Sequence, residues 1–102
     1  MERVINGTLT AILRREVKEY AGDVTTPLGE SKFYYTENPD EQIFCITIPY
    51  LSPELPASLL LMARIVDDQI VIDVDKMNKP LADALRQARI PQEQIILAWE
   101  SN

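Results

Sequence analysis

Residues 64–99 constrain the fold more than any other part of this sequence, because segments of different periodicity follow one another there without a long gap. An apolar run is followed by a two-residue acidic turn, a second apolar run, an amphipathic segment that starts at Pro80, and a last apolar run over residues 95–99. This order predicts strand, hairpin, strand, helix and strand. Since strand–helix–strand connections are right-handed, the last strand should run parallel to residues 69–74.

The N-terminal third predicts an amphipathic helix over residues 8–21, with apolar side chains at helical spacing. Asn6 or Thr8 could cap its start, and Gly22 suits the left-handed position after its end. Residues 23–30 hold Pro, Gly and Thr in a pattern without periodicity, which favours a loop.

The middle of the chain predicts a second hairpin, formed by residues 31–36 and 42–48 around a turn at Pro39. Alternation places Phe44 and its i+2 neighbours on the core face. Three prolines within residues 49–57 deny the backbone hydrogen-bond donors, so an irregular crossing loop should follow.

The expected fold class is therefore α+β, in one domain over residues 1–102. An N-terminal helix, antiparallel β-hairpins forming one sheet, a short crossover helix and a final strand parallel to its neighbour make up the architecture. The last strand is nearly all apolar, which predicts cover on both of its faces. The predicted core consists of Leu13, Val17, Phe44, Ile46, Ile72, Leu85 and Ile96.

Composition excludes several kinds of chemistry. The chain has no His, so neither a Ser-His-Asp triad nor a His-containing zinc site can form. Cys45 lies among apolar neighbours in a predicted strand, which favours an inert thiol over a nucleophile. We expect a protein that is not an enzyme and needs no cofactor.

Acidic residues are densest in and after the second hairpin, at Asp67, Asp68, Asp73 and Asp75. Alternation would place Asp73 and Asp75 on one face of a strand. The cluster could hold a divalent cation for metal-dependent catalysis, bind a basic partner protein, or simply keep a strand end hydrated. The segment lacks the Gly and the distal Glu of an EF-hand loop, so we favour the partner protein over the metal.

Basic residues follow the polar sides of the two predicted helices, at Arg14, Arg15, Lys18, Lys79, Arg86 and Arg89. They offer an alternative, a DNA-binding regulator. Solvated helix faces, with Asp83 and Arg86 paired at i and i+3, are the simpler interpretation. The net charge of −6 also opposes contact with a polyphosphate.

Amphipathic aromatic side chains are the best candidates for a protein interface, since such residues dominate binding hot spots. Here they are Tyr34, Tyr35, Tyr50 and Trp99.

Residues 64–99 resemble the C-terminal half of the XisI family, the fdxN-element excision controlling factors of cyanobacteria. The resemblance rests on the order of segments and on an ending that matches at Ile90, Pro91 and residues 94–97; residues 12–22, ILRREVKEYAG, resemble the first helix of that family. The chain lacks the Gly-Trp that usually follows the first hairpin of the family, and it carries Arg89 and Asp68 where Gly is common.

The resemblance implies a small cytoplasmic accessory protein of programmed DNA excision, encoded beside a second excision factor and not itself the recombinase. It transfers no catalytic residue. Together with the residues above, it predicts a homodimer or a complex with a second excision-type factor. The single Cys and the absence of a signal sequence agree with the cytoplasm, and we expect no segment to cross a membrane.

Overall fold

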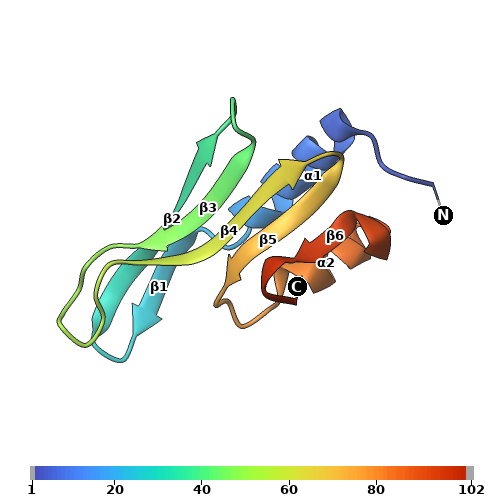
Figure 1. The fold of residues 1–102 in the computed structure, drawn as a ribbon. Helices are drawn as coiled ribbons and strands as arrows, with labels where there is room; N and C mark the ends of the chain where they lie inside the picture. Colours follow the sequence, from blue (N-terminus) through green and yellow to red (C-terminus); the bar gives the residue numbers. More distant parts are fainter. Residues whose placement is uncertain (1, 101–102) are drawn as a thin grey trace.

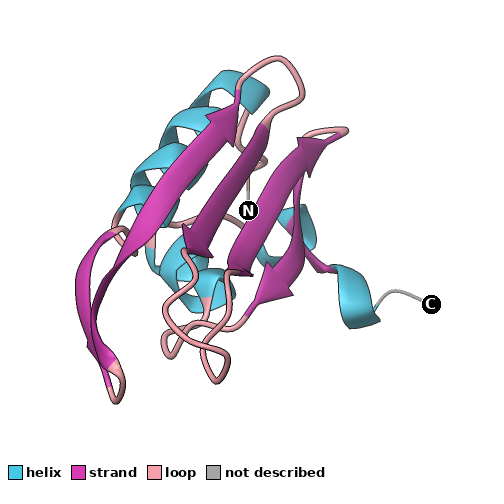
Figure 2. Ribbon diagram, turned by 90° about the vertical axis from the view of Figure 1, so that its left-hand side faces the viewer, coloured by secondary structure: helices cyan, strands magenta, loops and turns pink. Residues whose placement is uncertain are grey.

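The structure is a computed structural model that describes residues 2–100. It is an α+β fold in which six strands form one sheet in the order β1-β2-β3-β4-β5-β6, and both described α-helices lie on the same side of the sheet (Figures 1 and 2). The elements in chain order are α1 (Asn6–Lys18), β1 (Gly22–Thr26), β2 (Gly29–Asn38), β3 (Ile43–Ile48), β4 (Ser58–Val66), β5 (Gln69–Asp75), α2 (Leu81–Gln87), the 3-10 helix η1 (Gln92–Gln94), β6 (Ile95–Leu97) and the 3-10 helix η2 (Ala98–Glu100).

The sheet topology confirms the expected architecture. Strands β1 to β4 each pair antiparallel with the next strand in sequence, and β6 pairs parallel with β5 after the α2 crossover. Asp67 and Asp68 form the turn between β4 and β5 with φ of 50° and 61°, as the acidic two-residue turn predicted. Within residues 2–100, no helix is both long and apolar enough to cross a membrane.

Helix α1 packs its apolar stripe on the middle of the sheet. Leu9, Leu13 and Val17 are buried. The helix begins earlier than expected, and neither Asn6 nor Thr8 caps it: Ile5 is the N-cap residue and makes no side-chain capping bond. The Asn6 side chain accepts a hydrogen bond from the Gln42 amide instead, at 2.9 Å. A tertiary contact has replaced the local cap.

The loop expected over residues 23–30 is wrong, because this stretch forms a hairpin. The α1 C-cap is Glu19, and Gly22, with φ of 133°, starts β1 rather than ending the helix. Thr26 pairs with Gly29 around a two-residue turn, and the Thr26 hydroxyl donates to the Gly29 carbonyl at 2.7 Å. The stretch does contain a turn, as its residues predict, but this turn connects two strands that pair with each other.

Residues of the helix-covered side form the core. Phe44, Ile46 and Ile48 are buried, which confirms the predicted face of β3, and six of the seven predicted core residues are buried. Ile96 is the exception and is half-buried. It pairs with Val71, whereas its neighbour Ile95 pairs with the buried Ile70. The last strand is covered on one face, not two, because both α-helices lie on the same side of the sheet.

A register shift in the β4–β5 ladder changes the direction of the acidic side chains. Met62 lies opposite Val74 and Ala63 lies opposite Ile72, so Asp73 is an extra residue on β5. Beyond the bulge, Asp75 lies opposite the buried Leu61. The expectation that Asp73 and Asp75 share one face is therefore wrong, because the bulge reverses the alternation between them.

Helix α2 begins at Leu81, with Pro80 as its N-cap residue rather than its first helical residue. Leu81, Ala84 and Leu85 are buried against the sheet. The chain leaves the helix through Arg89, whose φ of 71° is left-handed. This conformation is the one that glycine adopts without cost.

Candidate protein interface

The two sides of the sheet differ in their cover. One side carries α1 and α2, and within residues 2–100 no helix packs across the other side (Figure 2). We call the second side the helix-free face. Its apolar side chains include Ile43, Cys45, Met62, Val71, Val74 and Ile96.

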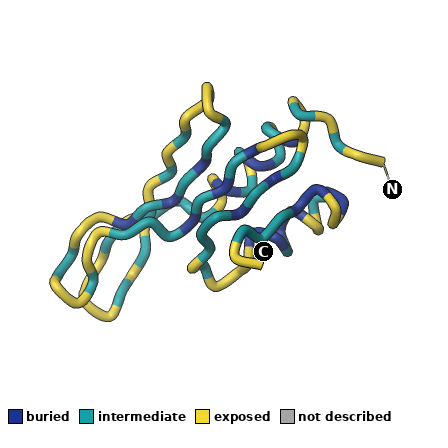
Figure 3. Tube along the Cα trace, viewed as in Figure 1, coloured by how far each residue is buried: buried dark blue, intermediate teal, exposed yellow. Residues whose placement is uncertain are grey.

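Cross-strand pairing arranges these six side chains around Arg64, which lies opposite both Ile43 and Val71. Cys45 and Val74 both lie opposite Met62, while Ile96 lies opposite Val71. All six are half-buried, and along β3 and β5 they alternate with the fully buried positions of the covered side (Figure 3). An antiparallel sheet that faces water on one side usually alternates apolar residues with polar ones. Here the helix-free side also carries several apolar side chains in its middle, beside one charged pair.

An ion pair lies in the middle of the helix-free face. Arg64 donates from Nε to Asp73 Oδ2 at 2.7 Å and from Nη2 to Asp73 Oδ1 at 3.2 Å. The two side chains are 40% and 22% exposed. The hydrogen bond to Asp73 raises the pKa of Arg64 further above its ordinary value. The face is therefore locally neutral, although the chain carries −6.

The four candidate aromatic residues do not form one patch. Tyr34 belongs to the helix-free face, where it pairs with Thr47 and is 45% exposed. Trp99, 52% exposed, lies in η2 beyond β6, at the opposite edge of the sheet, and Tyr50, 62% exposed, lies in the crossing loop. Tyr35 is on the helix-covered side.

Tyr35 takes part in an ionic network between α1 and β2. Its hydroxyl donates to Glu37 Oε1 at 2.5 Å, and Arg14 donates to both carboxylate oxygens of Glu37 at 2.8 and 2.7 Å. The bond from Arg14, followed by the bond from Tyr35, lowers the pKa of Glu37 to about 2. Burial, together with the hydrogen bond to Glu37, raises the pKa of Tyr35 well above its usual range. The Arg14–Glu37 pair therefore joins α1 to β2, and the Tyr35 hydroxyl adds a hydrogen bond to the same carboxylate.

The structure does not bring the acidic cluster together. Asp67 and Asp68 are exposed at the turn before β5, Asp73 pairs with Arg64, and Asp75 ends the strand. Asp75 accepts hydrogen bonds from the backbone N–H groups of Met77 and Leu81, at 3.0 and 2.8 Å. In the described chain, no three Asp, Glu or Cys side chains lie close enough to share a metal ion. The metal-dependent alternative therefore has no converging ligand set there.

Acidic partners interrupt the basic stripes. Arg14, Arg15 and Arg86 form ion pairs with Glu37, Glu16 and Asp83, respectively. The ammonium group of Lys18 lies 5.3 Å from the centre of the Tyr35 ring. Lys79 and Arg89 are exposed. The six residues form no continuous basic surface.

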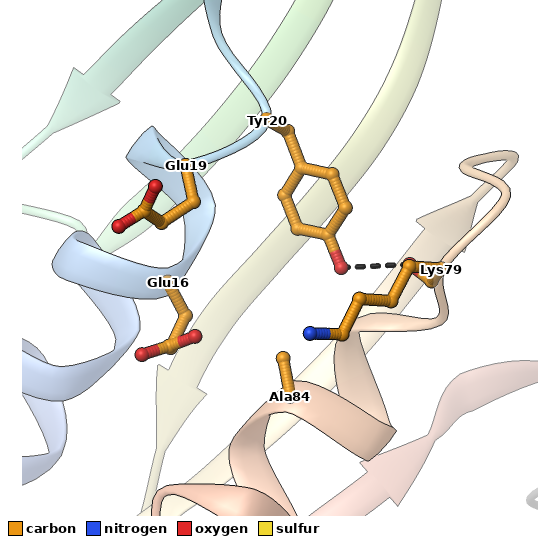
Figure 4. A pocket seen from close by; sticks show the side chains of 5 residues that line it. All are labelled: Glu16, Glu19, Tyr20, Lys79 and Ala84. Carbon is orange, nitrogen blue, oxygen red and sulfur yellow. Dashed lines mark hydrogen bonds between the residues drawn. The ribbon is translucent and has the colours of Figure 1, made fainter.

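A hollow of about 430 Å³ separates the C-terminal end of α1 from α2 (Figure 4). Glu16, Glu19, Tyr20, Lys79 and Ala84 line it. The Tyr20 hydroxyl donates to the Lys79 carbonyl oxygen at 2.7 Å, and burial, reinforced by the charge of Asp75, raises the pKa of Tyr20 to about 12. Tyr20 thus stays protonated and joins α1 to the segment before α2.

Sequence reasoning missed Gln94, which is fully buried. Its Oε1 accepts from the Val4 N–H at 2.7 Å, and its Nε2 donates to the carbonyl oxygens of Val4 and Asp68, each at 2.9 Å. One amide therefore joins the N-terminal segment, the β4–β5 turn and η1. The available signal was the position of Gln94, directly before an apolar strand.

The helix-free face was also missed. The signal was present in residues 43–48 and 69–74, where the positions between the core residues are themselves mostly apolar. Cys45 lies on this face and not in the core, and burial raises the pKa of its thiol.

These features define a small α+β protein whose six-stranded sheet is covered on one side by two helices. No family model and no curated protein matches the sequence. Its structure is similar to an XisI-like protein from Anabaena variabilis (TM-score 0.66, 13% identity, covering 89% of this chain and 80% of that one). It is also similar to the fdxN element excision controlling factor XisI from Anabaena variabilis (TM-score 0.59, 18% identity, covering 91% and 86%). The chain has the XisI fold, as the resemblance of residues 64–99 implied.

Proposed function

We propose that this chain is a cytoplasmic, non-enzymatic accessory protein that acts through protein–protein contacts in the control of DNA-element excision. The proposed role in excision follows from the structural similarity to XisI, the fdxN element excision controlling factor. The observation that supports protein–protein contacts is the helix-free face, where Ile43, Met62 and Val71 are only half-buried. Contiguous apolar surface of this kind marks an interaction site.

The partners proposed are a second copy of the chain and a second, basic excision-type factor. Asp67 and Asp68 project at an exposed turn, and the chain carries −6. Complementary charge accelerates the encounter with a basic protein and loses its effect as salt increases. The Asp75 carboxylate already accepts hydrogen bonds from the backbone of the same chain. Asp67 and Asp68 are therefore better candidates for contact with a basic partner.

The test is an excision assay in the organism that encodes the chain. The gene is deleted and restored as wild type, as Val71→Asp, or as Leu28→Asp, and the excised junction is quantified. Val71 is half-exposed on the helix-free face, and Leu28 is an exposed apolar residue at the tip of the β1–β2 hairpin. We expect the deletion and Val71→Asp to lose excision control and Leu28→Asp to keep it. Unchanged excision after deletion would contradict the proposal.

The alternative function, a DNA-binding regulator, remains a prediction. It requires Lys79, Arg89 and the ion-paired arginines to outweigh the carboxylates beside them. Fluorescence anisotropy with duplex DNA at low and moderate salt decides it, because phosphate contacts depend steeply on salt. Tight binding at low salt that falls with added salt would favour this alternative.

A further inference from the structure

We infer that the helix-free face is the interface with a second copy of this chain, which stacks its own helix-free face on the first across a two-fold axis. This inference rests on the proposed function, because it names the partner of the surface that supports it. The occupant follows from the chemistry of the face, from its charge and from its size.

The chemistry of the face matches the inner side of a β-sandwich. Met62, Val71 and Val74 project from adjacent strands, and the two neighbouring strands add Ile43 and Ile96. Two sheets that pack in this way lie about 10 Å apart, with side chains of both inner faces interleaved. The covered side already buries its apolar residues under α1 and α2, so a second sheet would give the helix-free face comparable cover.

The charge of the face favours a copy of itself over a strongly basic or a strongly acidic partner protein. A basic partner needs an acidic surface and an acidic partner needs a basic one. The middle of this face holds one Arg64 and one Asp73, which neutralise each other. A two-fold axis places each such pair against an identical pair. Within one chain, Nε and Nη2 of Arg64 donate to Asp73. The remaining guanidinium nitrogen, Nη1, can donate to Asp73 of the second copy.

The size of the face sets the expected strength. Strands lie about 4.8 Å apart and rise about 3.3 Å per residue, so six residues from each of β2 to β5 and the three residues of β6 give a flat footprint of roughly 430 Å². Side chains raise the accessible area above this footprint, toward the lower part of the range of stable interfaces, which bury about 800 Å² per partner. We expect a dimer of modest affinity that dissociates on dilution.

The native Cys45 reports on this interface without any mutation, because it is half-buried on the helix-free face. Its rate of maleimide labelling is measured from about 1 μM to about 1 mM protein, the range in which a modest interface dissociates. We expect the rate to fall about tenfold as the dimer forms. The control is Leu28→Cys in a Cys45→Ser background, where the thiol at the hairpin tip should label at one rate throughout.

Sedimentation of the wild type, Val71→Asp and Leu28→Asp gives a second measurement. We expect Val71→Asp to be monomeric and Leu28→Asp to dimerise like the wild type. Salt gives the wild-type dimer a distinct signature: two chains of −6 repel each other, so added salt should preserve or strengthen the dimer, whereas it would weaken a complex with a basic protein.

Two results would overturn the inference. One is a wild-type monomer over the whole concentration range. The other is a dimer in which Cys45 labels as fast as in dilute protein, because that dimer would use another surface. The proposed function fails separately: it is contradicted if deletion leaves excision unchanged, whether or not the chain dimerises.

Discussion

The two faces of the sheet are built by the same strands, yet they differ in how far they are buried. On the covered side Phe44, Ile46 and Ile72 are fully buried under the helices. On the helix-free side the intervening Ile43, Cys45 and others are of similar apolar character but only half-buried. Hydrophobic free energy scales with the area removed from water. Burial of the covered side therefore stabilises the single chain, and the helix-free side keeps apolar area in contact with water, which is the area that the proposed dimer would cover.

The largest difference between the faces should appear in a matched pair of truncations. Leu85→Ala, on the covered side, should lower the free energy of unfolding by about 2–5 kcal/mol through lost burial and a cavity. Met62→Ala, on the helix-free face, should cost less than about 1 kcal/mol in dilute protein, because its side chain is already partly solvated. Urea denaturation of both variants measures this difference. Equal losses would mean that the faces do not divide these roles.

The next prediction concerns the edge where η1 meets the core. Gln94→Leu should lower the free energy of unfolding by about 2–3 kcal/mol, because the N–H and C=O groups of Val4 and the C=O of Asp68 lose their partner. Gln87→Leu, at an exposed position of α2, is the control and should change stability by less than about 0.5 kcal/mol. A neutral Gln94→Leu would show that water replaces all three bonds.

Two aspartates of β5 sharpen the comparison, since the bulge sends them to opposite faces. Asp75→Ala should cost about 1–2 kcal/mol, because it removes the cap of the Leu81 N–H and the bond to Met77. Asp73→Ala should cost less than about 1 kcal/mol in dilute protein, as partly exposed ion pairs usually do. Thermal unfolding of the two variants would contradict the assignment if their order were reversed.

Arg89 adopts a left-handed conformation on the covered side, where α2 ends. Arg89→Gly should stabilise the protein by about 1 kcal/mol, because glycine reaches this conformation without the steric cost of a Cβ. Arg89→Ala keeps the Cβ and removes the guanidinium, so it controls for loss of charge and should not stabilise. Denaturation midpoints of the two variants separate backbone strain from charge.

The smallest effect is the pH dependence of the Arg14–Glu37 contact. The pKa of Glu37 falls from 4.5 to about 2 in the folded chain. A lowered pKa stabilises the fold above the ordinary value, and this contribution is lost as pH falls from about 4.5 to about 2. Solvent screening makes the effect modest. Glu37→Gln should flatten the acid side of the stability profile within this window, and a profile identical to that of the wild type would contradict the prediction.

The sequence by itself determined the elements whose signals are local. The spacing of Leu9, Leu13 and Val17 predicted the buried stripe of α1, alternation over residues 43–48 predicted the core face of β3, and two aspartates that tolerate positive φ predicted the β4–β5 turn. The order of segments in residues 64–99 predicted the parallel last strand. Each of these inferences needs a few neighbouring residues, and each is confirmed.

Only the tertiary structure decided the features that depend on distant partners. Residues 22–26 became β1 because β2 offered a strand to pair with, and the bulge at Asp73 reversed the direction of Asp75. Ile96 is half-buried because both helices cover the other side of the sheet, which no periodicity in β6 reveals. The helix-free face arises in the same way: an apolar residue becomes available for binding only when the rest of the fold leaves it uncovered.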